Sequence, residues 1–207
     1  HFMLPKNNTL LSCWSVLPAL AKVTKKIRLC SLVTPIPLYP IHLISKNVVT
    51  LDNISKGRAM FGVGAGWYQR EFEAYKIPFL TLKQRTEMVE EAVQIFKMLC
   101  EKGDSVNFEG KYYKISGAIF HPAPVQKPHP PIWTGGASKR ILSITAKYAQ
   151  GWIPYEQPLD IMKDKIEKLK ELLVKNGRRE EDVEIAMSFR CVVFDKKEDV
   201  EEVMQLL

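Results

Sequence analysis

Segments with helical periodicity alternate with short apolar runs of strand length along nearly the whole chain, and this alternation constrains the fold more than any other feature. The strand-length runs cover 27–35, 58–64, 132–135, 151–154 and 183–194. Several of them are almost continuously apolar, as expected for parallel strands that are covered on both faces. Strands that alternate with helices in this way are typical of an α/β fold built on a parallel sheet.

Helices are predicted between these runs, and one insertion interrupts the scheme. The helical segments cover 9–24, 40–54, a stretch that begins at Thr81, 138–148, 160–175 and 196–207. Thr81 and Gln84 have the spacing of a capping box at a helix start. Two strand-like runs on either side of Glu109-Gly110 predict a hairpin, and the prolines of 121–131 predict an extended connector. We therefore expect a single domain over 1–207, with an insertion at about 103–131.

The number of strands leaves two architectures open. A closed (β/α)₈ barrel typically needs about 250 residues, whereas this chain has 207 and five main strand-length runs. Either the sheet is open and doubly wound, or the chain forms an incomplete barrel. In both architectures ligands bind at the carboxyl ends of the parallel strands.

Two strand ends carry glycine-rich loops. In GVGAGW, Gly62 to Trp67, glycines at alternate positions permit close approach of the backbone to a flat ligand. This spacing is not the GxGxxG dinucleotide fingerprint, and a simple tight turn is the alternative interpretation. In WTGGASKR, Gly135 and Gly136 end a strand, and Ser138 stands where a helix N-cap belongs. The free N–H groups there favour an anion site, unless Ser138 only caps its helix.

Charge and composition argue against several other classes of function. The net charge of +7 raises the alternative of nucleic-acid binding, which would depend steeply on salt. However, the basic residues of 163–179 alternate with Glu167 and Glu171, as on a solvated helix face, and a positive field also attracts an anionic cofactor. The four cysteines form no CxxC pair and the histidines lack ligand spacing, so we expect neither a disulfide framework nor a metal.

Cys30 and Cys191 lie in predicted strands, where we interpret them as small core residues. His42, His121 and His129 are expected at the surface or in caps. Because the sequence has neither a membrane-spanning apolar run nor a secretory signal pattern, we expect a soluble, cytoplasmic protein without membrane contacts.

The segment LDNISKGRAMFGVGAGW, 51–67, closely resembles a passage of the luciferase-like monooxygenase superfamily, which includes FMN-dependent monooxygenases and deazaflavin-dependent oxidoreductases. The segments ALAKVTKKIRLCSLVT, KQRTEMVEEAVQIFKML, FEGKYYKI and PPIWTGGASKR also match in order. The resemblance covers nearly the whole chain. It implies an α/β fold of (β/α)₈ TIM-barrel type, with 27–34 as its third strand and 58–64 as its fourth. The barrel would be incomplete, lacking about two N-terminal strands and one C-terminal strand.

The resemblance also implies FMN or coenzyme F-420 as the cofactor. A non-prolyl cis peptide at Leu32–Val33, or at a neighbouring bond, would support the isoalloxazine ring. Residues at three strand ends would bind the cofactor: Leu32, Val33, Thr34, Gly64, Ala65, Gly66, Gly135, Gly136, Ala137 and Ser138.

Other positions concern the substrate and the proton chemistry. Trp67 would line the substrate pocket or only pack, and it stands where some deazaflavin dehydrogenases have a catalytic glutamate, which argues against sugar-phosphate dehydrogenation. Arg70 would meet a phosphate or an acidic substrate, whereas Arg58, at the other end of its strand, is interpreted as structural. His1 matches a histidine that the deazaflavin enzymes use in proton chemistry, which makes it the candidate catalytic residue.

The function expected from these features is oxidation or reduction of a small organic substrate. With reduced FMN the reaction would be monooxygenation, assisted by a separate flavin reductase, and with coenzyme F-420 it would be hydride transfer. The alternative is a non-catalytic flavin-binding or structural remnant, because missing strands would remove part of the pocket. Open sheet edges need to be covered, so we also expect a homo-oligomer.

Overall fold

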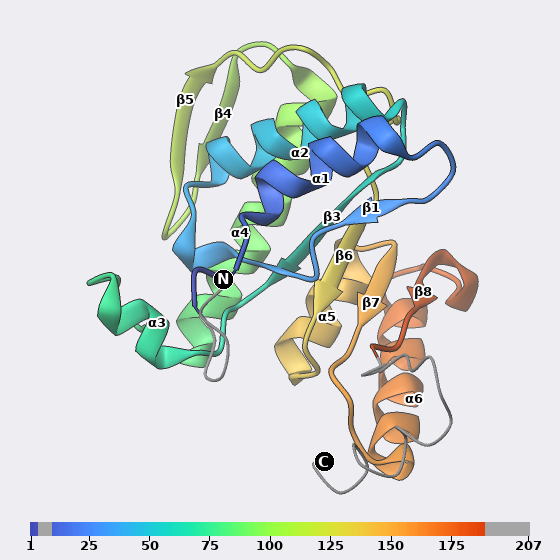
Figure 1. Cartoon of the computed structure of the whole chain (residues 1–207). Helices are drawn as coiled ribbons and strands as arrows, with labels where there is room; N and C mark the ends of the chain where they lie inside the picture. The colour runs from blue at the N-terminus through green and yellow to red at the C-terminus, as the bar shows by residue number, and fades with distance from the viewer. Residues whose placement is uncertain (4–9, 189–207) are drawn as a thin grey trace, which may run out of the picture.

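The computed structural model describes residues 1–3 and 10–188 and contains one parallel sheet at its centre (Figure 1). The strand order is β1-β3-β6-β7-β8, and β2 also pairs with β3. Every pair in this sheet is parallel. The strands are β1 (Leu29–Cys30), β2 (Thr34–Pro35), β3 (Ala59–Gly64), β6 (Ile132–Gly135), β7 (Gly151–Ile153) and β8 (Glu184–Ile185).

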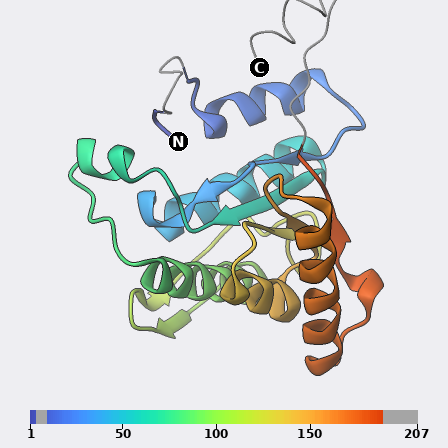
Figure 2. The ribbon, with the colours of Figure 1, turned by 90° about the horizontal axis from the view of Figure 1, so that it is seen from below.

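The helices form an arc around one side of this sheet, as Figure 2 shows. In chain order each main helix contacts the next. They are α1 (Cys13–Val23), α2 (Ile41–Ser55), α4 (Leu82–Lys102), α5 (Lys139–Tyr148) and α6 (Leu159–Lys175). The short elements are α3 (Gln69–Ala74) and the 3-10 helices η1 (Ile36–Leu38) and η2 (Glu180–Asp182). The main core lies between α2, α4, α5 and the strands, where Val48, Phe61 and Phe96 are fully buried.

The sheet is strongly curled, which distinguishes a barrel from a doubly wound sheet. β1 and β8 stand at opposite ends of the strand order, yet the guanidinium of Arg28 donates hydrogen bonds to both carboxylate oxygens of Glu184, at 2.9 and 3.2 Å. The paired strands β6 and β7 also pack closely, because a Cβ at Gly151 would lie 2.1 Å from the ring of its register partner Trp133. The predicted α/β fold of barrel type is therefore confirmed, and the open doubly wound alternative is wrong.

The strand predicted over 27–35 is interrupted. Residues 31–33 separate β1 from β2, and the Leu32–Val33 peptide bond is cis, in agreement with the resemblance. Side-chain hydrogen bonds are made where regular strand pairing stops. The hydroxyl of Ser31 donates to the carbonyl of Gly62 at 2.9 Å, and the hydroxyl of Thr34 donates to the hydroxyl of Ser31 at the same distance. Apolar periodicity does not reveal these local polar contacts at the interruption.

The predicted insertion is a hairpin that packs on α4. Strands β4 (Val106–Glu109) and β5 (Lys114–Ala118) are antiparallel. The Glu91 carboxylate accepts hydrogen bonds from the backbone N–H groups of 111–113, at 2.8 to 3.0 Å, and so ties the hairpin turn to the helix. The capping box of Thr81 and Gln84 is confirmed. Of the predicted strand 183–194 the structure describes only its beginning, while Cys191 and the helix predicted over 196–207 lie outside the described residues.

Two predictions about single side chains have different outcomes. Cys30 lies in β1 as expected but is only partly buried, so it is not a core residue; burial still raises the pKa of its thiol to about 12, which keeps it protonated. His129 is not at the surface but buried at 7% exposure, because its ring packs against Phe96 and its Nδ1 lies 2.9 Å from the carbonyl of Pro130. Burial lowers the pKa of His129, which favours the neutral ring. Among the described residues, none of the helices combines the length and the apolar character that a bilayer span requires.

Candidate functional site

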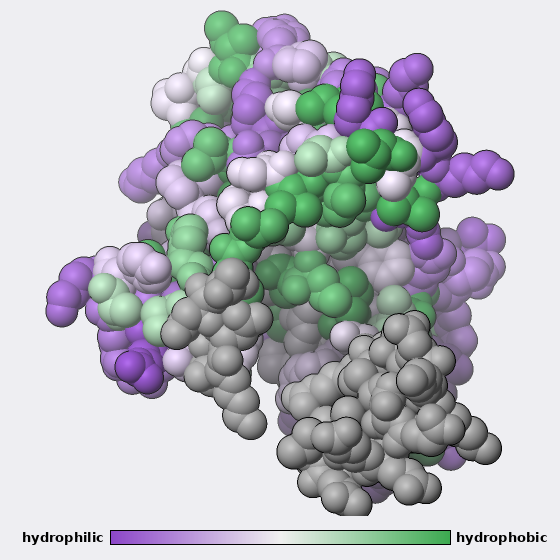
Figure 3. Space-filling model, in the orientation of Figure 1, coloured by the Kyte–Doolittle hydropathy of each residue, from purple (hydrophilic) through white to green (hydrophobic). Residues whose placement is uncertain are grey.

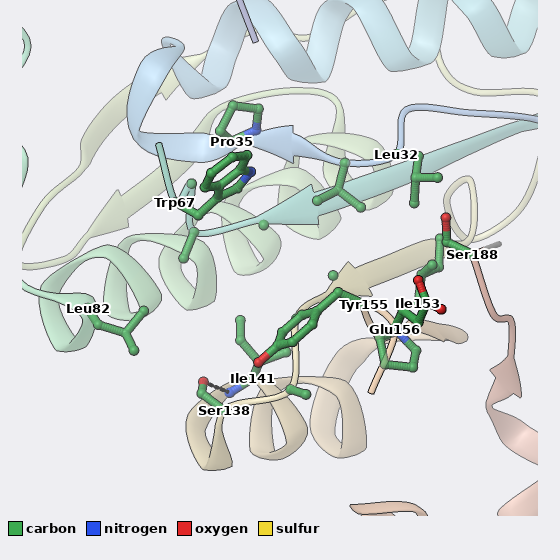
Figure 4. Close-up of a pocket in the computed structure, with 18 of the residues that line it drawn as sticks. Leu32, Pro35, Trp67, Leu82, Ser138, Ile141, Ile153, Tyr155, Glu156 and Ser188 are labelled. Carbon is green, nitrogen blue, oxygen red and sulfur yellow. Dashed lines mark hydrogen bonds between the residues drawn. The ribbon is translucent and has the colours of Figure 1, made fainter. Parts of the chain in front are cut away.

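A cavity of about 1030 Å³ lies at the carboxyl ends of the strands. Figure 3 shows hydrophobic side chains gathered around a hollow at the centre of this face. The loops after β1, β3, β6 and β7 form its walls, because parallel strands deliver their ends to the same edge of the sheet. In Figure 4, Trp67 and Pro35 lie together on one side of the cavity, and Tyr155 approaches Ile141 and Ser138 on the other.

Most of the predicted site residues meet in this cavity. Those that line it are His1, Leu32, Val33, Gly64, Ala65, Gly66, Trp67, Gly135, Gly136, Ala137 and Ser138. Two predicted residues do not line it. Thr34, the first residue of β2, is buried, and its hydroxyl donates to the hydroxyl of Ser31. Arg70 is exposed on α3 and stands outside the cavity wall.

The side chain of Val33 explains two of the glycines in the cavity wall. A Cβ at Gly64 would lie 2.6 Å from Cγ2 of Val33, and one at Gly135 would lie 2.7 Å from the same atom. Real Cβ atoms do not approach so closely, so both positions must be glycine for Val33 to occupy its place between the two strand ends. The glycines therefore make room for a protein side chain as well as for any ligand.

The start of α5 presents backbone donors toward the cavity. The hydroxyl of Ser138 accepts from the N–H of Ile141 at 3.3 Å, so the predicted N-cap is formed. Gly136 has a φ of 95°, and its carbonyl accepts from the indole of Trp152 at 2.7 Å, which fixes the turn. Within the described part of the chain, no hydrogen bond uses the N–H groups of Ala137 and Ser138. Such donors at a helix N-terminus favour an anion.

Sequence reasoning missed a cation at the same place. Lys165 reaches across from α6, lines the cavity and donates to the carbonyl of Ala137 at 3.0 Å. In the sequence Lys165 belongs to the basic stretch that we interpreted as a solvated helix face. Only the packing of α6 on α5 distinguishes it from the other basic residues of that stretch. The other cavity residues that were not predicted are Pro35, Leu82, Ile141, Ile153, Pro154, Tyr155, Glu156 and Ser188. The loop 154–156 follows β7 directly, so the strand-end rule itself could have found it.

His1 stands in the cavity wall in contact with two other side chains. Its Nδ1 lies 2.6 Å from Oε2 of Glu71, a residue of α3 whose side chain has no exposed surface. Its ring meets the indole of Trp67 at 5.9 Å between centroids, close to edge-on. The second oxygen of Glu71 accepts from the backbone N–H groups of Phe2 and Met3. The candidate catalytic histidine thus faces the cavity with one ring nitrogen engaged by a buried carboxylate.

Solved structures share this fold over most of the chain. A coenzyme F-420-dependent tetrahydromethanopterin reductase from Methanopyrus kandleri is 25% identical, with a TM-score of 0.80 over 91% of this chain and 57% of its own. A monooxygenase from Streptomyces bottropensis is 21% identical, with a TM-score of 0.80 over 94% of this chain and 59% of its own. A riboflavin lyase, solved with modified FMN and riboflavin, has the same TM-score at 19% identity, over 98% of this chain and 48% of its own.

These comparisons agree with the curled, barrel-type sheet. The chain spans about half the length of the structures it matches. The family model described as luciferase-like monooxygenase matches residues 1–207. Together with the strand-end cavity and the barrel-type sheet, this match shows that the chain belongs to the luciferase-like monooxygenase family.

Proposed function

We propose that this chain binds FMN or coenzyme F-420 in the strand-end cavity and acts as an oxidoreductase on a small organic substrate. The observation that carries the proposal is the convergence of three separate strand-end loops on one cavity, including Leu32, Gly64 and Gly135. The family includes enzymes of both cofactor types, and relatives named for each share the fold. A volume of about 1030 Å³ is at the upper end of the range of ligand sites.

The residues present fit a flat ring that carries a phosphate. The ring would lie against the 31–35 loop and the Gly64–Gly66 turn, where Val33 fills the space that the glycines leave and forms an apolar support. The phosphate would accept hydrogen bonds from the N–H groups of Ala137 and Ser138. Lys165 adds a positive charge beside these donors. When bound, either cofactor supplies the redox chemistry, and the protein supplies orientation and exclusion of water.

The walls of the remaining space favour a substrate with apolar parts. Trp67, Leu82, Tyr155 and Ile153 face this space, whereas Glu156 and Ser188 stand at one end of it (Figure 4). With reduced FMN the reaction would be monooxygenation, with a separate flavin reductase as partner, and with coenzyme F-420 it would be hydride transfer. Cys30 contributes no thiolate nucleophile, because burial raises the pKa of its thiol to about 12.

The cofactor is tested by titrating the purified protein with FMN and, separately, with coenzyme F-420, followed by fluorescence quenching. We expect micromolar affinity for one of the two. No binding of either cofactor by a folded protein would contradict the proposal and would favour the alternative of a non-catalytic family member.

Lys165→Met is expected to weaken cofactor binding about tenfold, because a hydrogen bond to a charged group contributes about 1.5 kcal/mol or more. The matched control is Lys168→Met on the same helix, which removes the same charge from an exposed residue paired with Glu171. Equal losses in the two variants would mean that only the overall charge matters, and no loss in Lys165→Met would place the phosphate elsewhere.

We further propose that the protein forms a homo-oligomer. On their outer sides, β1 and β8 have no strand partner among the described residues, and exposed sheet edges are normally covered. The outer face of α1 adds exposed apolar residues such as Leu20 and Val23. Light scattering should give a mass at least twice that of the chain, and a stable monomer at micromolar concentration would argue against this proposal.

A further inference from the structure

We propose that Glu71 is a positioning residue that selects one tautomer of His1, with the proton on Nδ1 and a free lone pair on Nε2 directed to the cavity. This inference builds on the proposed function, which gives that lone pair a bound partner. The tautomer itself is a property of the protein alone, and it is therefore tested without any cofactor.

The two carboxylate oxygens of Glu71 contact different groups. Oε2 lies 2.6 Å from Nδ1 of His1. Oε1 accepts from the backbone N–H of Phe2 and from that of Met3, the latter at 3.2 Å. An ionised carboxylate offers only acceptors, so beside the ionised Glu71 the short contact to Nδ1 requires that this nitrogen carry a proton. In a neutral imidazole Nε2 is then the acceptor.

Burial makes this arrangement selective. The Glu71 side chain has no exposed surface, and among the described residues no lysine or arginine forms an ion pair with it. A buried carboxylate is costly unless its oxygens are hydrogen-bonded. Within the described part of the chain, His1, Phe2 and Met3 supply all of its hydrogen-bond donors. Rotating the ring or moving its proton to Nε2 would remove the donor that faces Oε2.

The surroundings hold both partners in place. The residue after Glu71 is Phe72, which is fully buried and packs at 5.0 Å against the ring of Phe79. A Cβ at Gly66 would lie 2.9 Å from the Phe72 ring, so the turn after β3 closes tightly over α3. On the other side the indole of Trp67 packs near the His1 ring, at 5.9 Å between centroids. A helix of only 6 residues is too short to be stable alone, and α3 is thus fixed by packing.

This arrangement gives His1 a defined chemical task. Within the described residues no hydrogen bond uses Nε2, and His1 lines the cavity. An imidazole whose Nδ1–H is held by a carboxylate accepts a proton at Nε2 and returns it there, which is the behaviour of a general base that then acts as an acid. Glu71 takes no part in the proton transfer. It determines which nitrogen faces the bound group.

The test is the tautomer of His1 in Glu71→Gln, measured from the ring ¹⁵N shifts of protein labelled at histidine. In this variant the amide oxygen is expected to keep the two backbone N–H groups, so the amide NH₂ faces Nδ1 and donates to it. The proton of the imidazole must then move to Nε2, and the tautomer is inverted relative to the wild type. The His1 signals are assigned by their loss in His1→Gln.

Two further variants isolate the effect of the carboxylate. Glu71→Asp keeps the charge and is expected to retain the wild-type tautomer. Glu73→Gln, on the exposed side of the same helix, changes a carboxylate bonded only by Gln69 among the described residues and should leave His1 unchanged. An unchanged His1 tautomer in Glu71→Gln, or an Nε2–H tautomer in the wild type, would overturn the inference.

The outcome is separable from that of the proposed function. The cofactor titration uses the wild type, whereas the tautomer of His1 is measured without any cofactor. If the wild type binds neither cofactor but shows the Nδ1–H tautomer that Glu71→Gln inverts, the function proposal fails and the positioning role of Glu71 stands. If the wild type binds one of the cofactors but the tautomer does not respond to Glu71→Gln, the function proposal stands and the positioning role of Glu71 fails.

Discussion

Gly62→Ala is expected to lower the free energy of unfolding by about 3 kcal/mol and to abolish cofactor binding, because overpacking at a site enclosed by backbone cannot relax. A Cβ at Gly62 would lie 1.7 Å from the carbonyl oxygen of Ser31. That atom belongs to the main chain of the loop that lines the cavity, so no side-chain rotation can relieve the clash. The loop must move away from β3, and the hydrogen bond from Ser31 to Gly62 is lost.

The measurements are urea denaturation for the free energy of unfolding, thermal melting, and the cofactor titration. The melting temperature should fall by roughly 6 to 12 °C for a chain of this size. Gly136→Ala is a useful comparison, since that position has positive φ but no atom within 4 Å of the added Cβ. It should cost only about 1 kcal/mol, from the backbone conformation alone. Similar losses in the free energy of unfolding in Gly62→Ala and Gly136→Ala would contradict the steric explanation.

Arg58→Ala is expected to destabilise the protein by about 2 to 3 kcal/mol without affecting cofactor affinity in the protein that remains folded. The Arg58 guanidinium donates to the carbonyls of Ala21, Thr24, Ile27 and Ser55 at 2.7 to 3.0 Å, and to the hydroxyl of Thr24 at 3.1 Å. It thereby links the carboxyl ends of α1 and α2 to the loop before β1, where a cation also opposes the helix dipoles.

Arg58→Lys should recover little of this stability, because an ammonium group cannot make the same set of planar contacts. The matched control is Arg179→Ala. That side chain is 73% exposed and pairs only with Glu181 and Asp182 among the described residues, so its loss should cost far less stability than the loss of Arg58. The prediction fails if the control loses as much as Arg58→Ala, or if Arg58→Lys restores full stability.

The sequence alone determined the order of the elements. Apolar periodicity depends on which residues of a segment face the core, and that property is local. For this reason the sequence predicted the strands that end at Gly64 and Gly135 and the helix that Thr81 caps. The strand-end rule then predicted the position of the candidate site, because parallel strands bring their carboxyl ends to one edge. The structural role of Arg58 also follows from its position at the opposite end of β3.

Tertiary structure decided which architecture these elements form and how the site is completed. Periodicity does not say whether a sheet curls, and the contact between Arg28 and Glu184 brings together residues far apart in the chain. The same holds for Lys165 and Ala137, and for Glu71 and His1, which are distant in sequence and meet only through packing. Arg70 and Thr34 stand next to site residues in the sequence but not in the cavity, because the direction of a side chain depends on the local backbone. Sequence patterns record what each segment buries, and only the folded chain determines which buried or charged groups become partners.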